Sequence, residues 1–184
     1  MLGNDIVDLQ LAATQSNWRR KGYLQKIFTE QEQNLIKNAA DQDQMVWLLW
    51  SMKESAYKIV SLEVGERLYD PKSLECFMDY SRFTCKGKVV FEEFKLKTTT
   101  EITTNFINTT ATSELNCKIE HYLLRNPKNY IDDFNKLSNR YRLTKDETLL
   151  PIVQDMFTEE FCPASVSHHG RYVSIVHPTQ FEPV

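Results

Sequence analysis

The stretch WSMKESAYK, residues 50–58, sets three charged side chains in a strongly apolar helical pattern. With about 100° between successive residues, the helix predicted from Asp43 to Ser61 has one broad apolar stripe, which marks its core-facing side. The stripe contains Met45, Leu48, Leu49, Met52, Ala56, Ile59 and Val60. Glu54 and Lys58 fall on the opposite face. The aromatic residues that we expect to flank them there are Trp47, Trp50 and Tyr57.

Two interpretations of this charged face are open. Glu54 and Lys58 are four residues apart, so they can form a solvated ion pair that stabilises a helix by only about 0.3–0.5 kcal/mol. Alternatively, the face lines a cleft in which the lysines contact phosphate oxygens and Glu54 is a ligand of Mg²⁺. One carboxylate rarely holds Mg²⁺ alone, so this interpretation needs a second one.

Asp5 is the candidate for that second carboxylate. It lies in the strand-like stretch GNDIVDL, residues 3–9, next to a glycine that can present it in a cleft. The alternatives are a turn-forming Asp5 and a solvent-facing Asp8.

Two helices are predicted between this strand and the WSMKESAYK helix. The first spans roughly Leu11 to Ile27 and carries a basic cluster in WRRK, residues 18–21. The second begins at Thr29, because TEQE has the form of a capping box, in which Thr29 and Glu32 each accept a backbone N–H of the other. Glu30 and Glu32 could be metal ligands, but the cap already accounts for Glu32.

The middle and the end of the chain look β-rich. From about Leu74 to Thr112, Thr, Ile and Phe are frequent, which predicts two or three antiparallel strands with a turn at Lys86-Gly87. The last element is a strand from Arg171 to Val176, which follows a turn at Gly170.

Between these β regions lies a stretch with helical features. A polar helix is predicted at about 128–142. Next comes TKDETLLPIVQDMF, residues 144–157, which opens with a second capping-box pattern at Thr144 and Glu147 and is interrupted at Pro151.

Length and composition set outer limits. The chain has 184 residues, 41% of them hydrophobic, so we expect a single domain over residues 1–184. Its formal net charge of -3 gives no sign of nucleic-acid binding. The longest apolar run, MVWLLW, is too short to cross a membrane, and no secretory signal pattern precedes it, which predicts a cytoplasmic protein. The cysteines lack zinc-site spacing, so we expect free thiols at Cys76, Cys85, Cys117 and Cys162.

Taken together and in this order, three stretches resemble motifs of the 4′-phosphopantetheinyl transferase superfamily. They are GNDIVDL (3–9), WSMKESAYK (50–58) and SVSHHGRYVSIV (165–176), and FTEQE (28–32) is similar to a smaller family element. The Ser-His motif comes last, as in the short, holo-acyl-carrier-protein synthase type. The resemblance implies an α+β fold, a half-unit in which an antiparallel sheet is packed with helices, with an enlarged middle region at residues 61–164.

The resemblance also implies a reaction and its residues. Asp5 and Glu54 would hold Mg²⁺ against the pyrophosphate of coenzyme A. The implied phosphate contacts are Lys53, Lys58, Ser167 and His168. A serine of an apo acyl or peptidyl carrier protein would attack the β-phosphorus and take the 4′-phosphopantetheine group, which releases adenosine 3′,5′-bisphosphate. Glu54 and Lys58 would be catalytic, and Glu54 or a metal-bound water would accept the serine proton.

The implied partners follow from the same resemblance. Arg19, Arg20 and Lys21 sit where the short type has basic residues that dock the acidic carrier protein, although a solvated helix face is the alternative. A homo-oligomer, with a trimer favoured, is expected, because the short type holds coenzyme A between the Asp-Glu pair of one subunit and the Ser-His strand of its neighbour. The competing functions are a non-catalytic relative that binds carrier protein or coenzyme A, and an interaction protein with a Trp-rich docking face.

Three positions depart from the family pattern. Asn4 stands where an aliphatic residue is usual, and His169 stands where a small hydroxyl residue is usual. Val7 leaves no third carboxylate next to Asp5, so two protein ligands must suffice for Mg²⁺.

Overall fold

The computed structural model describes residues 1–65, 70–80, 83–113, 118–125 and 127–179. The helices are α1 (Leu9–Gln15), α2 (Tyr23–Ile27), α3 (Glu30–Asn38), α4 (Gln42–Val64) and α5 (Tyr130–Leu137). The strands are β1 (Leu2–Asp8), β2 (Glu75–Tyr80), β3 (Thr84–Phe91), β4 (Phe94–Ile102), β5 (Phe106–Thr112), β6 (Ile119–Leu124), β7 (Tyr141–Lys145), β8 (Pro151–Asp155), β9 (Phe161–Pro163), β10 (Ser165–His169) and β11 (Tyr172–Pro178).

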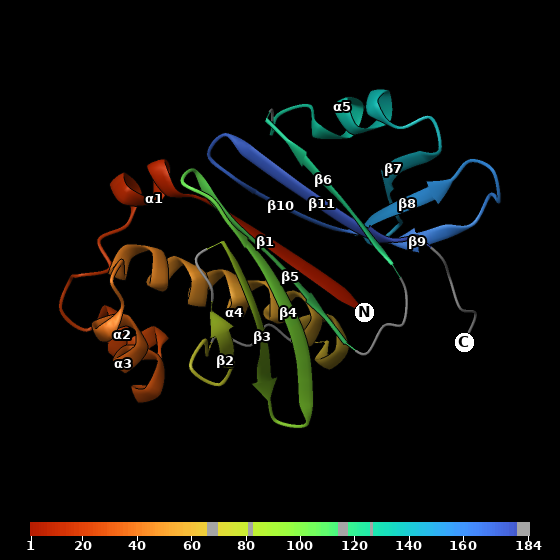
Figure 1. Cartoon of the computed structure of the whole chain (residues 1–184). Coiled ribbons are helices and arrows are strands. Elements are labelled where there is room, and N and C mark those ends of the chain that lie inside the picture. Colours follow the sequence, from red (N-terminus) through yellow and green to blue (C-terminus); the bar gives the residue numbers. More distant parts are fainter. Residues whose placement is uncertain (66–69, 81–82, 114–117, 126, 180–184) are drawn as a thin grey trace.

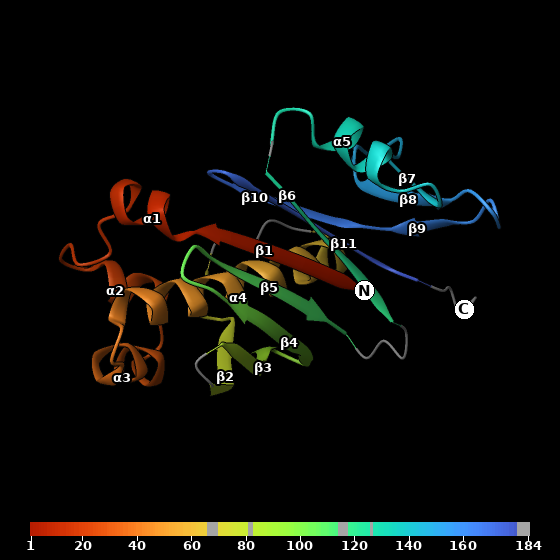
Figure 2. The same ribbon diagram turned by 45° about the horizontal axis from the view of Figure 1, so that its top comes forward.

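The strands form three antiparallel sheets. The largest has the order β1-β5-β4-β3-β2, and α4 packs across it (Figure 1). A second sheet has the order β10-β11-β6, and a third has the order β7-β8-β9. β10 and β11 run alongside β1, on the side away from β5 (Figure 2). The predicted α+β class, with antiparallel sheets packed with helices, is therefore confirmed.

Helix α4 is the centre of the main core. The Asp41 side chain caps its first turn by accepting the N–H of Gln44, and the helix ends at Gly65, whose φ is +72°. The seven residues of the predicted apolar stripe are all buried. Trp47 is also buried, with 6% of its surface exposed, so its predicted place outside the core is wrong. The reason is that α1, α3 and β1 pack around α4 and bury more than one face of it.

The predicted helix from Leu11 to Ile27 is broken in two. The Asp8 side chain caps α1 by accepting the N–H groups of Gln10 and Leu11, and α2 begins only after Gly22, whose φ is +85°. Residues 18–21 therefore lie in a turn and not on a helix face. The capping box at the start of α3 is confirmed, because Thr29 and Glu32 make both of its hydrogen bonds.

The segment from Leu74 to Thr112 contains four strands, β2 to β5, and not two or three. The turn predicted at Lys86-Gly87 is wrong, since both residues pair with β2 inside β3. A Cβ atom at Gly87 would lie 2.5 Å from the carbonyl oxygen of Phe77. The glycine thus permits close packing, and the chain reverses instead at Glu92, with φ of +49°.

The predicted capping box at Thr144 and Glu147 is also wrong. Thr144 lies in β7, and the segment 144–157 forms the β7-β8 hairpin. Asp146 makes the turn, because its Oδ1 accepts the N–H groups of Thr148 and Leu150. Of the helix predicted at 128–142, only α5 is helical. The final strand and the turn at Gly170, whose φ is +56°, are confirmed.

Two larger buried clusters and a small one hold the chain together. The small one contains Ile6, Phe106 and Tyr172. Of the two larger clusters, one lies between α4 and the five-stranded sheet, and the other joins α5 to β6, β7, β8 and β11. Cys76, Cys85 and Cys162 are free and buried, and Cys117 lies outside the described residues. Among the described residues, no helix has the length and apolar character needed to span a membrane.

Candidate functional site

Strand β1 and helix α4 bring Asp5, Glu54 and Lys58 together. Asp5 points out of β1 into a buried position, and its Oδ2 atom has no hydrogen-bond partner among the described residues. Burial raises the pKa of Asp5, although the nearby Lys58 ammonium lowers it. Burial, and secondly the charge of Asp5, raise the pKa of Glu54 to about 7. Two carboxylates in one poorly solvated place repel each other, so the site favours a cation.

Lys58 is part of the same cluster and also joins two strands. Its Nζ donates to the carbonyl oxygen of Asn4 at 2.6 Å and to that of Val166, in β10, at 3.1 Å. Burial lowers the pKa of Lys58, while Asp5 and Glu54 raise it. The interpretation of Glu54 and Lys58 as a solvated surface pair is therefore wrong.

Strand β10 covers the other side of this cluster. Along β10, Ser165 and Ser167 are buried and His169 is half-buried, while His168 is exposed and lines the pocket described below. His169 accepts the N–H of Asp8 at its Nδ1 over 2.9 Å. The buried Oγ of Ser167 has no hydrogen-bond partner among the described residues. Ser167 and Asp5 therefore both keep a polar atom that a ligand could use.

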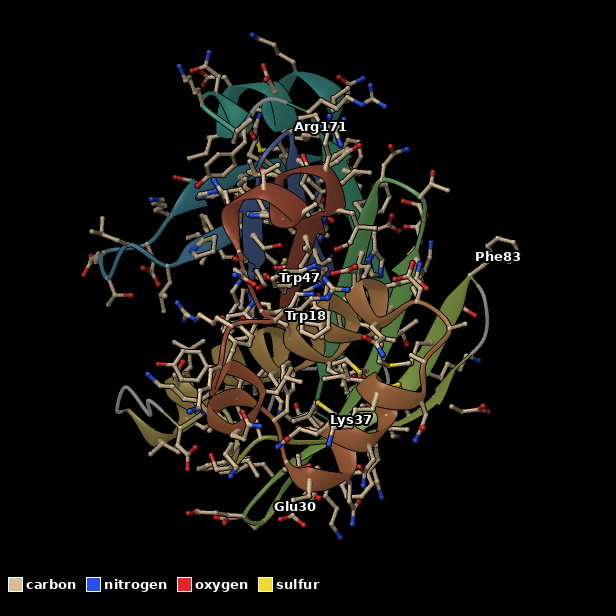
Figure 3. The ribbon with its side chains drawn as sticks, turned by 90° about the vertical axis from the view of Figure 1, so that its left-hand side faces the viewer. Trp18, Glu30, Lys37, Trp47, Phe83 and Arg171 are labelled. Atoms are coloured by element: carbon tan, nitrogen blue, oxygen red, sulfur yellow. The ribbon has the colours of Figure 1, made fainter. Side chains whose placement is uncertain are left out.

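A pocket of about 190 Å³ opens beside these residues. It is lined by Asp5, Ile6, Val7, Ala12, Ser16, Tyr23, Trp47, Trp50, His168 and His169. A neighbouring hollow of about 270 Å³ shares Ala12, Ser16 and Trp47 with it and extends to Trp18 and Arg19. Figure 3 shows Trp18 and Trp47 close together on this face. The two hollows share three lining residues and together extend from Asp5 to Trp18 and Arg19; we call them the groove.

The acidic pair suits Mg²⁺ bound mainly through its substrate. Mg²⁺ usually keeps several waters and takes one or two carboxylates together with substrate phosphates. The unpartnered Oδ2 of Asp5 and the partly buried Glu54 fit that requirement. Across the residues that the structure describes, no group of three or more His, Cys, Asp or Glu side chains gathers as a metal cage.

Lys53 does not reach the site, which corrects its prediction as a phosphate contact. Its Nζ lies 2.8 Å from Glu32 Oε1 and donates to the carbonyl oxygens of Pro71 and Leu74, and only 1% of its side chain is exposed. Glu32 Oε1 also accepts the N–H of Cys76. The lysine therefore ties α4 to α3 and to the start of β2.

Asp8 is neither solvent-facing nor part of the acidic pair. Besides capping α1, it pairs with Arg171 in a two-pronged contact at 2.8 Å for each oxygen. That hydrogen-bonded pair holds the pKa of Asp8 well below its usual range. A Cβ at Gly170 would lie 2.4 Å from Asp8 Oδ2, so a glycine is needed where β10 turns into β11 beside β1.

The basic cluster lies at the far end of the groove. Arg19 pairs with both oxygens of Asp43, at 2.8 and 3.0 Å, and its guanidinium stacks on Trp18. The guanidinium of Arg20 lies over the ring of Tyr23, which lines the pocket. Lys21 is exposed in the turn. Arg19 is therefore already engaged within the chain, whereas Lys21 faces solvent.

The acidic pair predicts how stability depends on pH in metal-free protein. The pKa of Glu54 is about 7 in the folded state against 4.5 for an ordinary glutamate, so the folded state keeps its proton to higher pH than the unfolded chain does. We compare the free energy of unfolding of the unaltered protein with that of Glu54→Gln, measured with urea in chelator, because desolvation lowers the pKa values of His121 and His177, which opposes the effect in the same pH range. The stability of the unaltered protein relative to Glu54→Gln should fall by on the order of 3 kcal/mol from pH 4.5 to 7. A difference that does not change with pH would contradict the pKa assignment.

Asp8 does not mask this effect. Its pKa is lowered, so the stability that it contributes is lost only when the pH falls below the ordinary value of 3.8. The two pH windows are separate. Saturating Mg²⁺ should flatten the slope between pH 4.5 and 7, because the cation binds the ionised carboxylates.

Two residues at the site were noted in the sequence only as departures. Asn4 is completely buried and makes hydrogen bonds with Ser165 and Ser174, and His169 reaches Asp8 as described above. The sequence marked Asn4 because the family pattern has an aliphatic residue there. It marked His169 because the pattern has a hydroxyl residue there. Ser51, whose Oγ donates to the carbonyl oxygen of Asp5 at 3.4 Å, gave no sequence signal.

One comparison with known proteins, that with family models, agrees with the motifs. The sequence model of the 4′-phosphopantetheinyl transferase superfamily matches residues 1–125, which include β1 and α4 but not β10. No curated protein matches the chain. Among solved structures, the holo-acyl-carrier-protein synthase (AcpS) of Thermotoga maritima is similar over 85% of both chains, with 12% sequence identity and a TM-score of 0.47.

Proposed function

The chain belongs to the 4′-phosphopantetheinyl transferase superfamily, and we propose that it transfers the 4′-phosphopantetheine group of coenzyme A to a serine of an apo carrier protein. We further propose a holo-acyl-carrier-protein synthase activity that depends on Mg²⁺ and operates in the cytoplasm. The observation that carries this proposal is the acidic pair, because Asp5 Oδ2 lacks a partner among the described residues and burial together with the charge of Asp5 raises the pKa of Glu54.

The residues of this chain would first bind and orient coenzyme A. Ser167 Oγ has no partner among the described residues and can donate to a phosphate oxygen. His168 and His169 both line the pocket, and Trp50 and Tyr23 offer apolar surface to the rest of the molecule. Mg²⁺, held by Asp5 and Glu54, would neutralise charge on the pyrophosphate and so help adenosine 3′,5′-bisphosphate to leave.

Glu54 would also take the proton of the incoming serine. The serine oxygen forms a bond to the β-phosphorus, the bond from that phosphorus to the bridging oxygen breaks, and the serine proton goes to a base. An ionised carboxylate within reach of the serine hydroxyl suits that role. Lys58 would hold Asn4 and Val166 in place beside the reacting phosphates, through the two carbonyl contacts of its ammonium group.

A mass measurement tests the proposal. Purified protein is incubated with apo acyl carrier protein or apo peptidyl carrier protein, coenzyme A and Mg²⁺, and the carrier is weighed by mass spectrometry. We expect a gain of one phosphopantetheine group that chelator abolishes. No gain with several carriers would refute the transferase, and binding without transfer would support a non-catalytic relative. An interaction protein would bind neither coenzyme A nor its product.

The exposed Lys21 should contribute to recognition of the acidic carrier. Lys21→Glu is expected to raise the KM for the carrier about 3–10-fold at low salt and to leave kcat unchanged, because surface charges act mainly on association. The difference should shrink as salt is added. Lys37→Glu, an exposed lysine on α3, is the control. Equal effects of the two variants would show that the turn at residues 18–21 does not dock the carrier.

A further inference from the structure

The edge of β1 that does not pair with β5 is covered by β10, which contacts it through side chains and not through strand pairing. Within its sheet, β1 pairs only with β5, which leaves its other edge open. At that edge the N–H of Asn4 donates to Ser165 Oγ at 3.0 Å, and the N–H of Asp8 donates to His169 Nδ1 at 2.9 Å. Two side chains of β10, four residues apart, thus meet two backbone groups of β1 that are also four residues apart.

Asn4 completes this contact with its side chain. Its Oδ1 accepts from Ser165 Oγ at 2.8 Å, and its Nδ2 donates to the carbonyl oxygen of Ser174 at 2.9 Å and to Ser174 Oγ at 3.0 Å. Asn4, Ser165 and Ser174 are all buried, so water cannot replace the lost partners if β10 moves away. We call these three residues the Asn4 clasp.

Ser167 lies between the two contacts along β10. The clasp fixes one end through Ser165, and His169 together with the ion pair of Arg171 and Asp8 fixes the other. Lys58 bonds the carbonyl oxygen of Val166, the neighbour of Ser167. Ser167 therefore lies on a strand that is held against β1 at both ends, and its buried Oγ, like Asp5 Oδ2, has no hydrogen-bond partner among the described residues.

We infer that one chain carries a complete site, with Asn4 as the positioning residue that holds its own Ser-His strand against its own acidic pair. The short-type resemblance implied that a neighbouring subunit supplies that strand. In this structure β10 of the same chain lies along the free edge of β1, and its histidines line the same pocket as Asp5. Catalysis then does not require association of subunits. The kinetic tests of this inference rest on the proposed function, whereas the test of where β10 lies does not.

A designed disulfide tests the placement without any activity assay. Asn4→Cys combined with Ser165→Cys should form a disulfide under mild oxidation, since the two side chains touch and β10 keeps its contacts through Val166 and His169. The experiment uses a mixture of unlabelled and nitrogen-15-labelled protein, with Asn4→Cys alone as the control for reaction with native cysteines. We expect linked peptides of one isotope only. Mixed-isotope peptides, or no link, would overturn the inference.

A mixing assay tests whether the site is shared. One variant carries Asp5→Asn and Glu54→Gln, and the other carries Ser167→Ala and His168→Ala. After both are unfolded and refolded together, a self-contained site should give only the mean of their two residual activities. Sites shared between subunits would instead recover about one quarter of the unaltered activity, because random assembly reunites intact halves. That recovery would refute the inference.

The role of Asn4 has its own readout. Asn4→Val, which restores an aliphatic residue, should raise the KM for coenzyme A about 10-fold and leave the KM for the carrier unchanged, because the displaced strand carries Ser167. Ser174→Ala, which removes a single partner, should have a smaller effect in the same direction. A lower kcat with both KM values unchanged would mean that Asn4 supports only folding, and Asn4 would then not be a positioning residue. If the unaltered protein proves inactive, the proposed function fails, and the disulfide still decides where β10 lies.

Discussion

Replacing Glu54 with glutamine is expected to lower kcat/KM for coenzyme A by about 10²–10³-fold while the protein stays folded. Glutamine keeps the size of the side chain but cannot offer a negative oxygen to Mg²⁺ or accept the serine proton. Burial and repulsion from Asp5 raise the pKa of Glu54, so removing its charge should not destabilise the metal-free fold. Activity is measured by carrier mass gain, and folding by urea unfolding.

The matched control for this variant lies on the same helix. Glu63→Gln changes an exposed glutamate near the end of α4, and it should leave activity unaltered. Full activity of Glu54→Gln would refute the assignment of Glu54. Equal losses in both variants would point to a general effect of charge on α4.

Replacing Lys53 with methionine is expected to lower the free energy of unfolding by about 3–5 kcal/mol, the usual cost of leaving a buried charge without its partner. The stranded group is Glu32, whose side chain is 1% exposed and lies 2.8 Å from the lysine ammonium. The carbonyl groups of Pro71 and Leu74 also lose their donor. Urea unfolding at pH 7 measures the change.

Two variants make this prediction specific. Lys37→Met removes an exposed lysine and should change stability by less than about 0.5 kcal/mol. Adding Glu32→Gln to Lys53→Met should recover part of the loss, because the uncharged amide can still accept the N–H of Thr29. If the double variant is no more stable than the single one, the buried charge is not the cause.

The local features of the fold were predicted well because they depend on neighbouring residues. The apolar stripe of α4 repeats with the helical period, and the capping box at Thr29 needs only four residues. Gly87 shows where such reasoning fails. The glycine is needed because Phe77 of β2 and Met52 of α4 pack closely against it, and neither contact can be read from the residues next to Gly87. The same reason explains the wrong helix start at Thr144. A capping-box pattern needs only four residues, and the sequence does not show that β8 pairs with this segment.

The candidate site was predicted in part. Asp5, Glu54 and Lys58 lie together as predicted. Lys53 and Lys58 have similar sequence surroundings, but their side chains lie in different places. Lys58 faces Asp5, whereas Lys53 points to Glu32 across the core. The position of a residue on a helix gives the direction of its side chain, but it does not show which charged group that side chain will contact. Only the packing of α3 against α4 shows that Lys53 contacts Glu32 and Lys58 does not.

The sequence by itself determined the helix α4 with its acidic and basic face, the strand that carries Asp5 and the family to which both belong. Only the tertiary structure decided where the Ser-His strand lies, because its contact with β1 joins residues 161 positions apart, from Asn4 to Ser165. Side-chain bonds to an open strand edge leave no periodic pattern in a sequence. The physical reason for the outcome is the Asn4 clasp, whose buried polar groups are satisfied because β10 covers β1.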